Sequence, residues 1–243
     1  MPTGPKAMAA EVHVLCAGAV KGLVLAVQPG FEAAAGVRLQ ARFGAVGAMR
    51  DELAAGAPCD VFVATQAMVA ALAASGALRA GSSAAIGRVQ TAIAVREAAP
   101  RPTIDSADAL RATLLAAAAL YFPDATRSTA GAHVVAVLAR LGLRETLAPR
   151  LRMYANGAAA MRELAAASEA PALGCTQATE IRYTPGLALV GPLPAPFALA
   201  TVYSAAIGTA TRDESVARGF VDLLAGSASA ALRRAGGFDP VAA

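Results

Sequence analysis

The feature that most constrains the fold of this chain is a regular alternation of short apolar runs with helix-like segments. The runs at residues 11–17, 60–64 and 172–176 are largely apolar, which is typical of strands buried on both faces of a parallel sheet. Segments predicted as helices follow the first two runs, at residues 20–35 and 66–75. Strands that alternate with helices through short loops predict an α/β fold, in which helices flank a mostly parallel sheet.

The order of the predicted elements divides the chain into two lobes. A strand at residues 89–95 is expected to lead into the second lobe, and a strand at residues 198–206 to return to the first. We therefore expect lobe I to comprise residues 1–88 and 201–243 and lobe II residues 89–200, with two hinge crossovers. Small ligands usually bind in clefts between such domains.

The charge pattern argues against nucleic acid as a partner. The formal net charge is +4, but the basic residues are almost all Arg and are spread singly along the chain. Binding to a phosphate backbone requires many cations on one face. Only 5% of the residues are aromatic and there is no Trp, so stacking platforms for bases are not expected either. A small anionic ligand held by a few groups fits this composition better.

Cysteine and histidine usage predicts neither a disulfide scaffold nor a metal site. The three cysteines, Cys16, Cys59 and Cys175, are widely spaced and form no C-x-x-C pair. His13 and His133 are the only histidines, which is too few for a histidine-based metal centre. We expect buried free cysteines, no metal and no cofactor.

The apolar stretches do not predict a membrane span. The uncharged runs at residues 61–78 and 184–211 are interrupted by polar residues or prolines, so neither supplies about 20 consecutive apolar residues. Residues 1–10 contain Lys6 and end in a small-x-small pattern, but lack the apolar core of a secretory leader. The expected location is periplasmic if an upstream leader was trimmed or misread, and cytoplasmic if the chain as given is complete.

Small residues open several of the predicted helices, at residues 17–19, 44–47, 127–131 and 156–157. In α/β sheets, ligands bind beyond the carboxyl ends of the strands, where such loops lie. A helix start offers unpaired backbone N–H groups and a partial positive charge, so several converging helix starts hold an anion without a dedicated cation. The alternative for each single loop is ordinary turn chemistry.

Three segments carry a family resemblance: EVHVLCAGAVKGLV (11–24), RFGAVGAMRDELAAGAPCDVFVAT (42–65) and YFPDATRSTAGAHVVAVLARLGL (121–143). They resemble the periplasmic molybdate-binding proteins and their wider relatives, and the resemblance covers nearly the whole chain. Its more specific parts are residues 56–63 and the helix-opening residues 129–131. The resemblance implies a two-lobed type II periplasmic-binding-protein fold, with two hinge crossovers and an anion held in the cleft.

Departures from the family pattern argue against molybdate itself. The resemblance implies a serine hydroxyl in each of the first two loops and a tyrosine after the late strand, where this chain has Ala19, Val46 and Gln177. Each lost hydroxyl removes a donor that contributes roughly 1.5–3 kcal/mol when it bonds a charged group. Three such losses are enough to abolish tight binding of a tetrahedral oxyanion.

Two segments close to these positions in the sequence resemble an organic-anion branch of the superfamily, which includes aconitate isomerase. Ala-Gly-Ala-Val-Lys, ending at Lys21, and Cys-Thr-Gln-x-x-Glu, ending at Glu180, carry this likeness. Arg127 suits a carboxylate because its planar fork bonds both oxygens. The alternatives are a solvated Lys21, a surface Arg127, and an ion pair of Glu180 with Arg182 or Arg127.

The sequence therefore predicts a substrate-binding protein of the ABC-transporter type that captures a small organic carboxylate between its lobes. The alternative is an aconitate isomerase-like enzyme that moves an allylic proton, with His133, Lys21 and Glu180 as acid–base candidates; a packed structural role is the other interpretation of His133. We expect a monomer whose partners are the anion and a transporter membrane component. The predicted ligand-binding residues are Gly18, Ala19, Lys21, Ala45, Val46, Arg127, Ser128, Thr129, Ala130, Asn156, Gly157 and Gln177.

Overall fold

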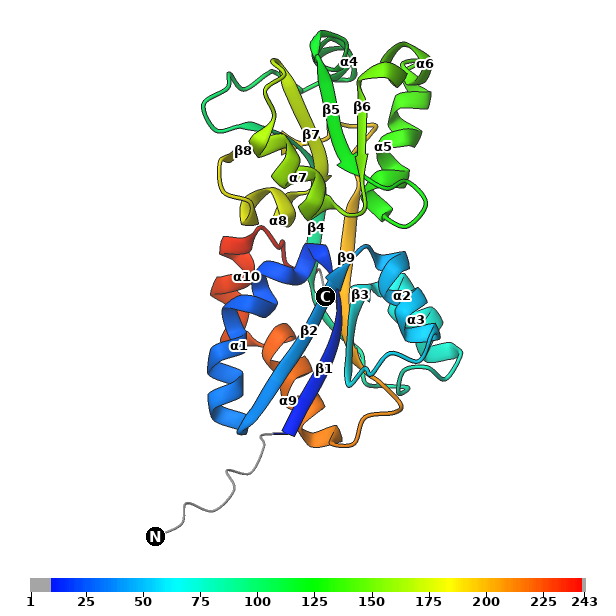
Figure 1. Ribbon diagram of the computed structural model, residues 1–243, viewed down its shortest axis with the longest axis vertical. Coiled ribbons are helices and arrows are strands. Elements are labelled where there is room, and N and C mark those ends of the chain that lie inside the picture. The colour runs from blue at the N-terminus through cyan, green and yellow to red at the C-terminus, as the bar shows by residue number, and fades with distance from the viewer. Residues whose placement is uncertain (1–9, 242–243) are drawn as a thin grey trace.

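A computed structural model describes residues 10–241 of the chain, and two lobes lie one above the other along its long axis (Figure 1). The N-terminal pattern around Lys6 lies outside the described residues. Lobe I contains the strands β1 (Ala10–Ala17), β2 (Val37–Gly44) and β3 (Val61–Thr65), with the helices α1 (Lys21–Ala35), α2 (Val46–Ala54), α3 (Gln66–Ala74), α9 (Glu214–Ala225) and α10 (Ala230–Gly236). A short 3₁₀ turn, η1 (Gly18–Val20), joins β1 to α1.

Lobe II follows the same plan. Its strands are β5 (Ala119–Pro123), β6 (Leu151–Tyr154), β7 (Ala172–Gln177) and β8 (Leu187–Pro192), and its helices are α4 (Ala107–Ala116), α5 (Thr129–Arg140), α6 (Arg144–Leu147), α7 (Gly157–Ala166) and α8 (Ala178–Tyr183). Two long strands, β4 (Ala84–Arg96) and β9 (Ala200–Ile207), run through the junction of the lobes (Figure 1).

The sheet topology matches the two-lobed α/β fold expected from the sequence. The strand order is β2-β1-β3-β9-β4-β7-β5-β6, and β8 pairs with β4. Strand β1 pairs in parallel with β2 and β3, and β5 pairs in parallel with β6 and β7. The strands at the junction are antiparallel: β9 pairs with β3 and β4, and β4 pairs with β7 and β8. Parallel order within each lobe brings the carboxyl ends of its strands to one edge.

One strand serves both lobes. In β4, residues 84–90 pair with β9 of lobe I, whereas residues 91–94 pair with β7 of lobe II. The sequence predicted that this strand begins at residue 89, but it begins five residues earlier, at Ala84. The first residues of β4 are held in the sheet by pairing with the distant strand β9, which the local sequence does not reveal. The expected lobe boundaries at residues 88 and 200 stay a prediction, since β4 is unbroken at the crossover.

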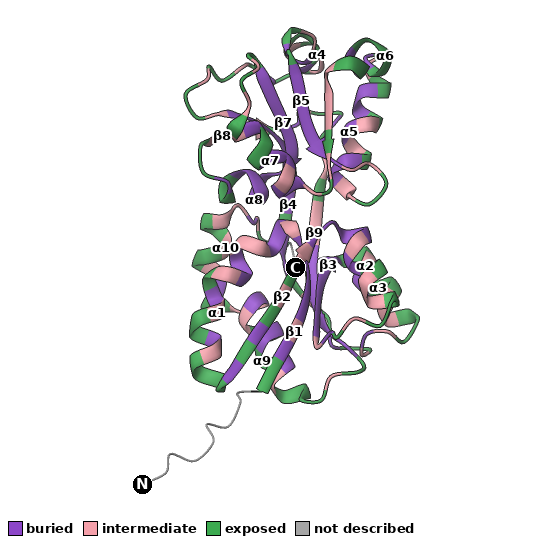
Figure 2. Cartoon of the chain, in the orientation of Figure 1, coloured by how far each residue is buried: buried purple, intermediate pink, exposed green. Residues whose placement is uncertain are grey.

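Two clusters of buried apolar side chains form the core, and Figure 2 shows buried residues concentrated on the central strands. The first contains the fully buried Phe62 and Phe220 and extends into lobe II at Met161 and Leu164 of α7. The second lies wholly within lobe II and contains the fully buried Phe122. Because the first cluster crosses the junction, it holds the two lobes against each other.

The expected buried free cysteines are confirmed for all three positions. Burial raises the pKa of the Cys59 and Cys175 thiols to about 12, so both are neutral. Between residues 10 and 241, no helix has the length and apolar character that crossing a bilayer requires.

Helix boundaries were predicted well where a capping residue marks them. Ser106 caps α4, as expected, by accepting a hydrogen bond from the Ala109 N–H at 3.1 Å. Helix α7 has the predicted bounds, and its cap is Asn156. The short elements α6, α8 and β8 were missed; α8 has only six residues, too few for a helical period to be visible in the sequence.

Replacing Gly131 with alanine is expected to lower the free energy of unfolding by about 2 kcal/mol. Gly131 lies in the first turn of α5, and a Cβ there would meet the carbonyl oxygens of Pro123 and Asp124. These are backbone atoms at the end of β5, so they cannot move aside as a flexible side chain does. Urea denaturation followed by circular dichroism measures the change; an unaltered midpoint would show that α5 moves away from β5 without cost.

Candidate functional site

A closed pocket lies between the lobes, at the carboxyl ends of β1, β2 and β7. Its cavity volume is about 20 Å³, roughly the space of one water molecule, so the lobes have to separate for a larger ligand to enter. Its lobe I lining consists of Ala17, Gly18, Ala19, Gly44, Ala45 and Val46, its lobe II lining of Ser128, Thr129, Asn156, Gly157, Gln177 and Glu180, and Tyr203 of β9 completes it. The structure thus brings together nine of the predicted ligand-binding residues: Gly18, Ala19, Ala45, Val46, Ser128, Thr129, Asn156, Gly157 and Gln177.

Four helix starts meet around this pocket. They belong to η1 with α1, to α2, to α5 and to α7. Ser128 caps α5 by accepting from the Gly131 N–H at 3.3 Å, and Asn156 caps α7 by accepting from the Ala159 N–H at 2.9 Å. The first N–H groups of a helix have no partner within the helix, and its dipole makes this end positive. The pocket therefore favours a negative charge.

The two lobes touch on both sides of the pocket. On one side, the Gly47 N–H of α2 donates to the Arg127 carbonyl of lobe II at 2.9 Å. On the other, the Lys21 ammonium lies 5.4 Å from the centre of the Tyr183 ring of lobe II and 5.5 Å from that of Phe43. Cations are attracted to ring faces at these distances. The cleft is thus closed in this structure.

Glu180 has the most unusual environment in the pocket. Its side chain on α8 is buried, and Oε2 accepts a 2.5 Å hydrogen bond from the Thr176 hydroxyl. Burial raises the pKa of this carboxyl from its ordinary value of 4.5 to about 7, although the Thr176 hydroxyl and the N–H groups of Gln177 and Ala158 oppose the rise. The carboxyl also fills the space beside Gly18 and Gly157, where neither residue has room for a Cβ.

Gln177 is a second unusual polar residue of the pocket, because its amide group is buried without a hydrogen-bond partner among the residues that the structure describes. Its side chain is only 2% exposed, and neither its amide nitrogen nor its amide oxygen has a hydrogen-bond partner among residues 10–241. Leaving a buried polar group unpaired costs about 1–3 kcal/mol. A ligand in the pocket is the natural partner for this amide.

Tyr203 was not predicted as a pocket residue, whereas Ala17 and Gly44 lie in the helix-opening loops that were expected to meet at the ligand. Tyr203 is buried on β9, and its pKa is raised by burial and by its proximity to the ionisable groups of Glu180 and Cys16. The resemblance implied a tyrosine near Gln177, and the absence of one there was the signal to look for a phenol on another strand.

Four predicted residues do not line the pocket: Lys21, Arg127, Ala130 and His133. The Arg127 side chain is exposed, and its backbone carbonyl accepts a hydrogen bond from lobe I. The Nε2 atom of His133 lies 2.7 Å from the Phe197 carbonyl oxygen, so this histidine is hydrogen-bonded away from the pocket. Within the described chain, Glu180 forms no ion pair with Arg127 or Arg182.

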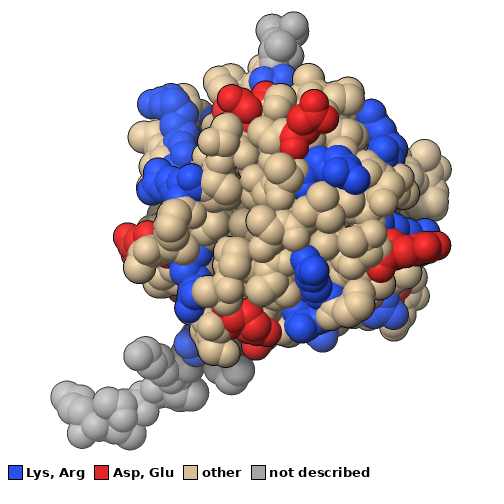
Figure 3. Space-filling view, turned by 90° about the horizontal axis from the view of Figure 1, so that it is seen from above, with Lys and Arg blue, Asp and Glu red and all other residues tan. Residues whose placement is uncertain are grey.

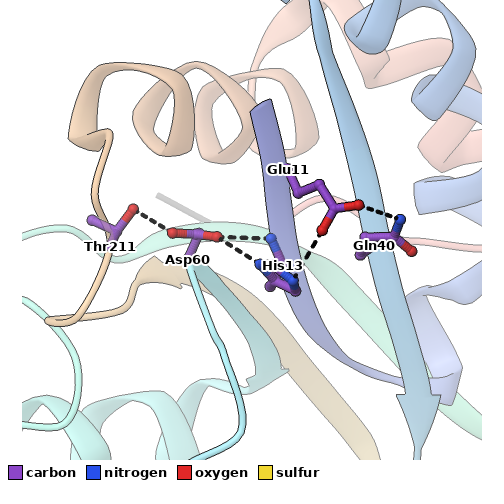
Figure 4. A network of polar contacts seen from close by, with 5 residues as sticks. All are labelled: Glu11, His13, Gln40, Asp60 and Thr211. Carbon is purple, nitrogen blue, oxygen red and sulfur yellow. Dashed lines mark hydrogen bonds and ion pairs between the residues drawn. The ribbon is translucent and has the colours of Figure 1, made fainter. Parts of the chain in front are cut away.

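His13 lies toward the opposite end of β1, where two carboxylates flank its ring (Figure 4). Its Nδ1 atom is 3.5 Å from Asp60 and its Nε2 atom 3.8 Å from Glu11. Asp60 also accepts from the His13 N–H at 2.7 Å and from the Thr211 hydroxyl at 2.6 Å. The two ring nitrogens face different carboxylates, so this network joins β1 to its neighbours rather than forming a convergent metal site.

The surface shows no concentration of cations in the end-on view. In Figure 3, Lys and Arg side chains stand in small separate groups among uncharged and acidic ones. This face therefore lacks the continuous basic stripe that binding to a phosphate backbone requires.

Known proteins resemble this chain in sequence and in fold. Residues 12–239 match the family model described as bacterial extracellular solute-binding protein. An aconitate isomerase from Pseudomonas sp is 30% identical over 236 residues, which cover 95% of this chain and 88% of that protein.

Solved structures share the fold at lower identity. The periplasmic molybdate-binding protein of Azotobacter vinelandii has a TM-score of 0.77 at 19% identity, covering 95% of this chain and 100% of that one. A sulfate-binding protein of Mycobacterium tuberculosis has a TM-score of 0.74 at 18% identity, covering 96% and 87%. With the family match over almost the whole described chain, these likenesses lead to one conclusion: the chain belongs to the bacterial extracellular solute-binding protein family.

Proposed function

We propose that this protein captures a small organic carboxylate in the pocket between its lobes, which widens as the lobes separate to admit it. The observation that carries the proposal is the unpartnered Gln177 amide, which faces a pocket surrounded by four helix starts. Helix starts and amide donors suit an anion. Relatives named as molybdate-binding and sulfate-binding proteins support an anion as the ligand.

The lining favours a carboxylate over a tetrahedral oxyanion. Ala19 and Val46 present apolar groups to the pocket, at the positions where the resemblance to molybdate-binding proteins implies serine hydroxyls. The Gln177 amide offers both a donor and an acceptor, and Glu180 offers a carboxyl group. An organic acid has apolar carbon atoms that can contact Ala19 and Val46. It also has carboxylate oxygens that can bond to Gln177 and Glu180. Molybdate presents only oxygens.

Thermal shift and calorimetry with trans-aconitate, cis-aconitate, citrate, molybdate and sulfate test the proposal. We expect at least one organic anion to raise the melting temperature and to bind with a measurable heat. Stabilisation by molybdate or sulfate alone would assign the pocket to inorganic oxyanions instead. An absence of binding by the whole panel would overturn the proposal.

Replacing Gln177 with alanine is expected to weaken the affinity for the bound carboxylate about tenfold, because one hydrogen bond to a charged ligand is lost. Gln66→Ala is the matched control, since Gln66 is exposed at the start of α3, outside the pocket lining. Calorimetry of both variants measures the difference. Equal affinities for the two variants would mean that the Gln177 amide does not contact the ligand.

A capture role fits delivery of the anion to the membrane component of an ABC-type transporter. This role calls for a location outside the cytoplasmic membrane, on the side from which the solute arrives. Co-purification with a membrane component in detergent, with and without the bound anion, tests the partnership.

A second function, an aconitate isomerase-like proton shift, is favoured by Glu180. A general acid–base group works best with a pKa near the working pH, and burial gives this carboxyl a pKa of about 7. A single carboxyl of this kind removes a proton from one carbon of an allylic tricarboxylate and returns it to another. The 30% identity to an aconitate isomerase supports this candidate.

Exchange in deuterated water separates the two functions. Incubation with cis- or trans-aconitate, followed by proton NMR, is expected to show interconversion and loss of the allylic signal if the protein is an isomerase. Glu180→Gln should then abolish exchange. Binding without exchange assigns the protein to capture alone.

A further inference from the structure

The Glu180 carboxyl lies where the two lobes meet. It lies beside Gly18 of lobe I and Gly157 of lobe II, and both glycines also line the pocket. Among the lining residues, all within the described part of the chain, Glu180 is the one acid. An anion bound at the surrounding helix starts therefore shares this small cavity with a carboxyl group.

No cation in the lining offsets that carboxyl. The lining residues between 10 and 241 include neither Lys nor Arg. The Lys21 ammonium, which follows the first of these helix starts, lies over the Phe43 and Tyr183 rings instead. Two like charges that share a cavity screened from bulk water repel each other strongly. A helix start carries only about half of a positive elementary charge, so an ionised Glu180 opposes much of what the pocket gains.

The groups that face Glu180 do not supply the missing charge. Tyr203 of β9 and Cys16 of β1 are buried and remain neutral, because burial raises the pKa of both. Thr176 of β7 and the N–H groups of Gln177 and Ala158 act through hydrogen bonds. The charged residues on the other elements packed against α8 are exposed or half-buried, and none of them contributes to the pKa shift of the Glu180 carboxyl. They are Lys21 and Glu32 on α1, Arg88 and Arg96 on β4, Arg162 and Glu163 on α7, and Arg233 and Arg234 on α10.

We propose that Glu180 contacts the captured anion as a neutral carboxylic acid, so that each anion bound takes up one proton from solution when Glu180 starts ionised. The O–H then donates a hydrogen bond to the anion, and the repulsion disappears. The inference rests on the proposed capture of an anion in this pocket. It makes Glu180 a specificity-determining residue that couples affinity to pH.

Calorimetry from pH 7 to pH 9 with trans-aconitate and with succinate tests the coupling. Both probes are fully ionised over this range, so a change in affinity reports on the protein. The wild-type affinity is expected to fall about fivefold from pH 7 to pH 8 and about tenfold from pH 8 to pH 9, or about 50-fold over the whole range. Glu180→Gln is expected to keep one affinity throughout, because its amide carries no charge. Glu163→Gln, at an exposed acid on α7, should keep the wild-type pH profile.

Proton uptake gives a second measurement that needs no variant. Binding heats of the wild-type protein at pH 8, measured in two buffers of different ionisation enthalpy, are expected to report close to one proton taken up per anion. Affinity that does not change with pH, together with no proton uptake, overturns the role of Glu180 but leaves anion capture intact. Failure of both probes to bind at any pH overturns the capture of carboxylates, and this inference with it.

Discussion

Replacing Gly157 with alanine is expected to weaken anion binding about 100-fold. A Cβ at this position would meet the Glu180 carboxyl and the Thr176 hydroxyl, which are hydrogen-bonded to each other. Either the carboxyl moves into the pocket or the start of α7 moves away from it. Overpacking of this kind costs about 1–3 kcal/mol, and about 2.7 kcal/mol corresponds to a 100-fold loss of affinity.

The matched control for this substitution is Gly30→Ala. Gly30 lies in α1, and a Cβ there would meet nothing within 4 Å. Alanine within a helix is more favourable than glycine by roughly 0.5–1 kcal/mol, so this variant should bind normally and be slightly more stable. Calorimetry and thermal denaturation of both variants provide the comparison. Normal binding by the Gly157→Ala variant would show that the pocket does not depend on the contact between α7 and Glu180.

The gathering of the helix starts could be predicted from the sequence because it depends on topology alone. Loops at the carboxyl ends of parallel strands meet at one edge of a sheet, and β1, β2 and β7 all end at the pocket. Ser128, Thr129 and Gly157 therefore came together as expected. Backbone geometry decides such positions, and the strand–helix alternation encodes it.

Side-chain directions could not be predicted in the same way. Lys21, Arg127 and His133 lie within a few residues of a helix start, yet their side chains contact ring faces, solvent and the Phe197 carbonyl. Which face of a helix meets the cleft depends on how the lobes pack, and a single sequence does not contain that information. Tyr203 was missed for the related reason that it projects from an antiparallel strand, whose register is set by β3 and β4.

The ligand-free protein is expected to lose stability as the pH rises from about 4.5 to 7. The native state keeps a proton on Glu180 up to a pKa of about 7, whereas the unfolded chain releases it near 4.5. In this window the unfolded state binds fewer protons than the native state, so the free energy of unfolding falls with rising pH. A difference of this size in pKa corresponds to a contribution of roughly 3 kcal/mol to the free energy of unfolding. The protein has this contribution below pH 4.5 and has lost it above pH 7.

Glu180→Gln isolates this contribution from the other titrating groups. The Glu32 and Asp124 carboxyls have pKa values lowered by hydrogen bonds, so they favour the native state as the pH rises, in the opposite sense. Their effect is common to both proteins and cancels in the comparison. The variant is expected to match the wild type at pH 4 and to exceed it by roughly 3 kcal/mol at pH 8, as measured by urea denaturation. The same difference at both pH values would mean that Glu180 ionises normally in the folded protein, because only a shifted pKa makes the effect of the substitution depend on pH.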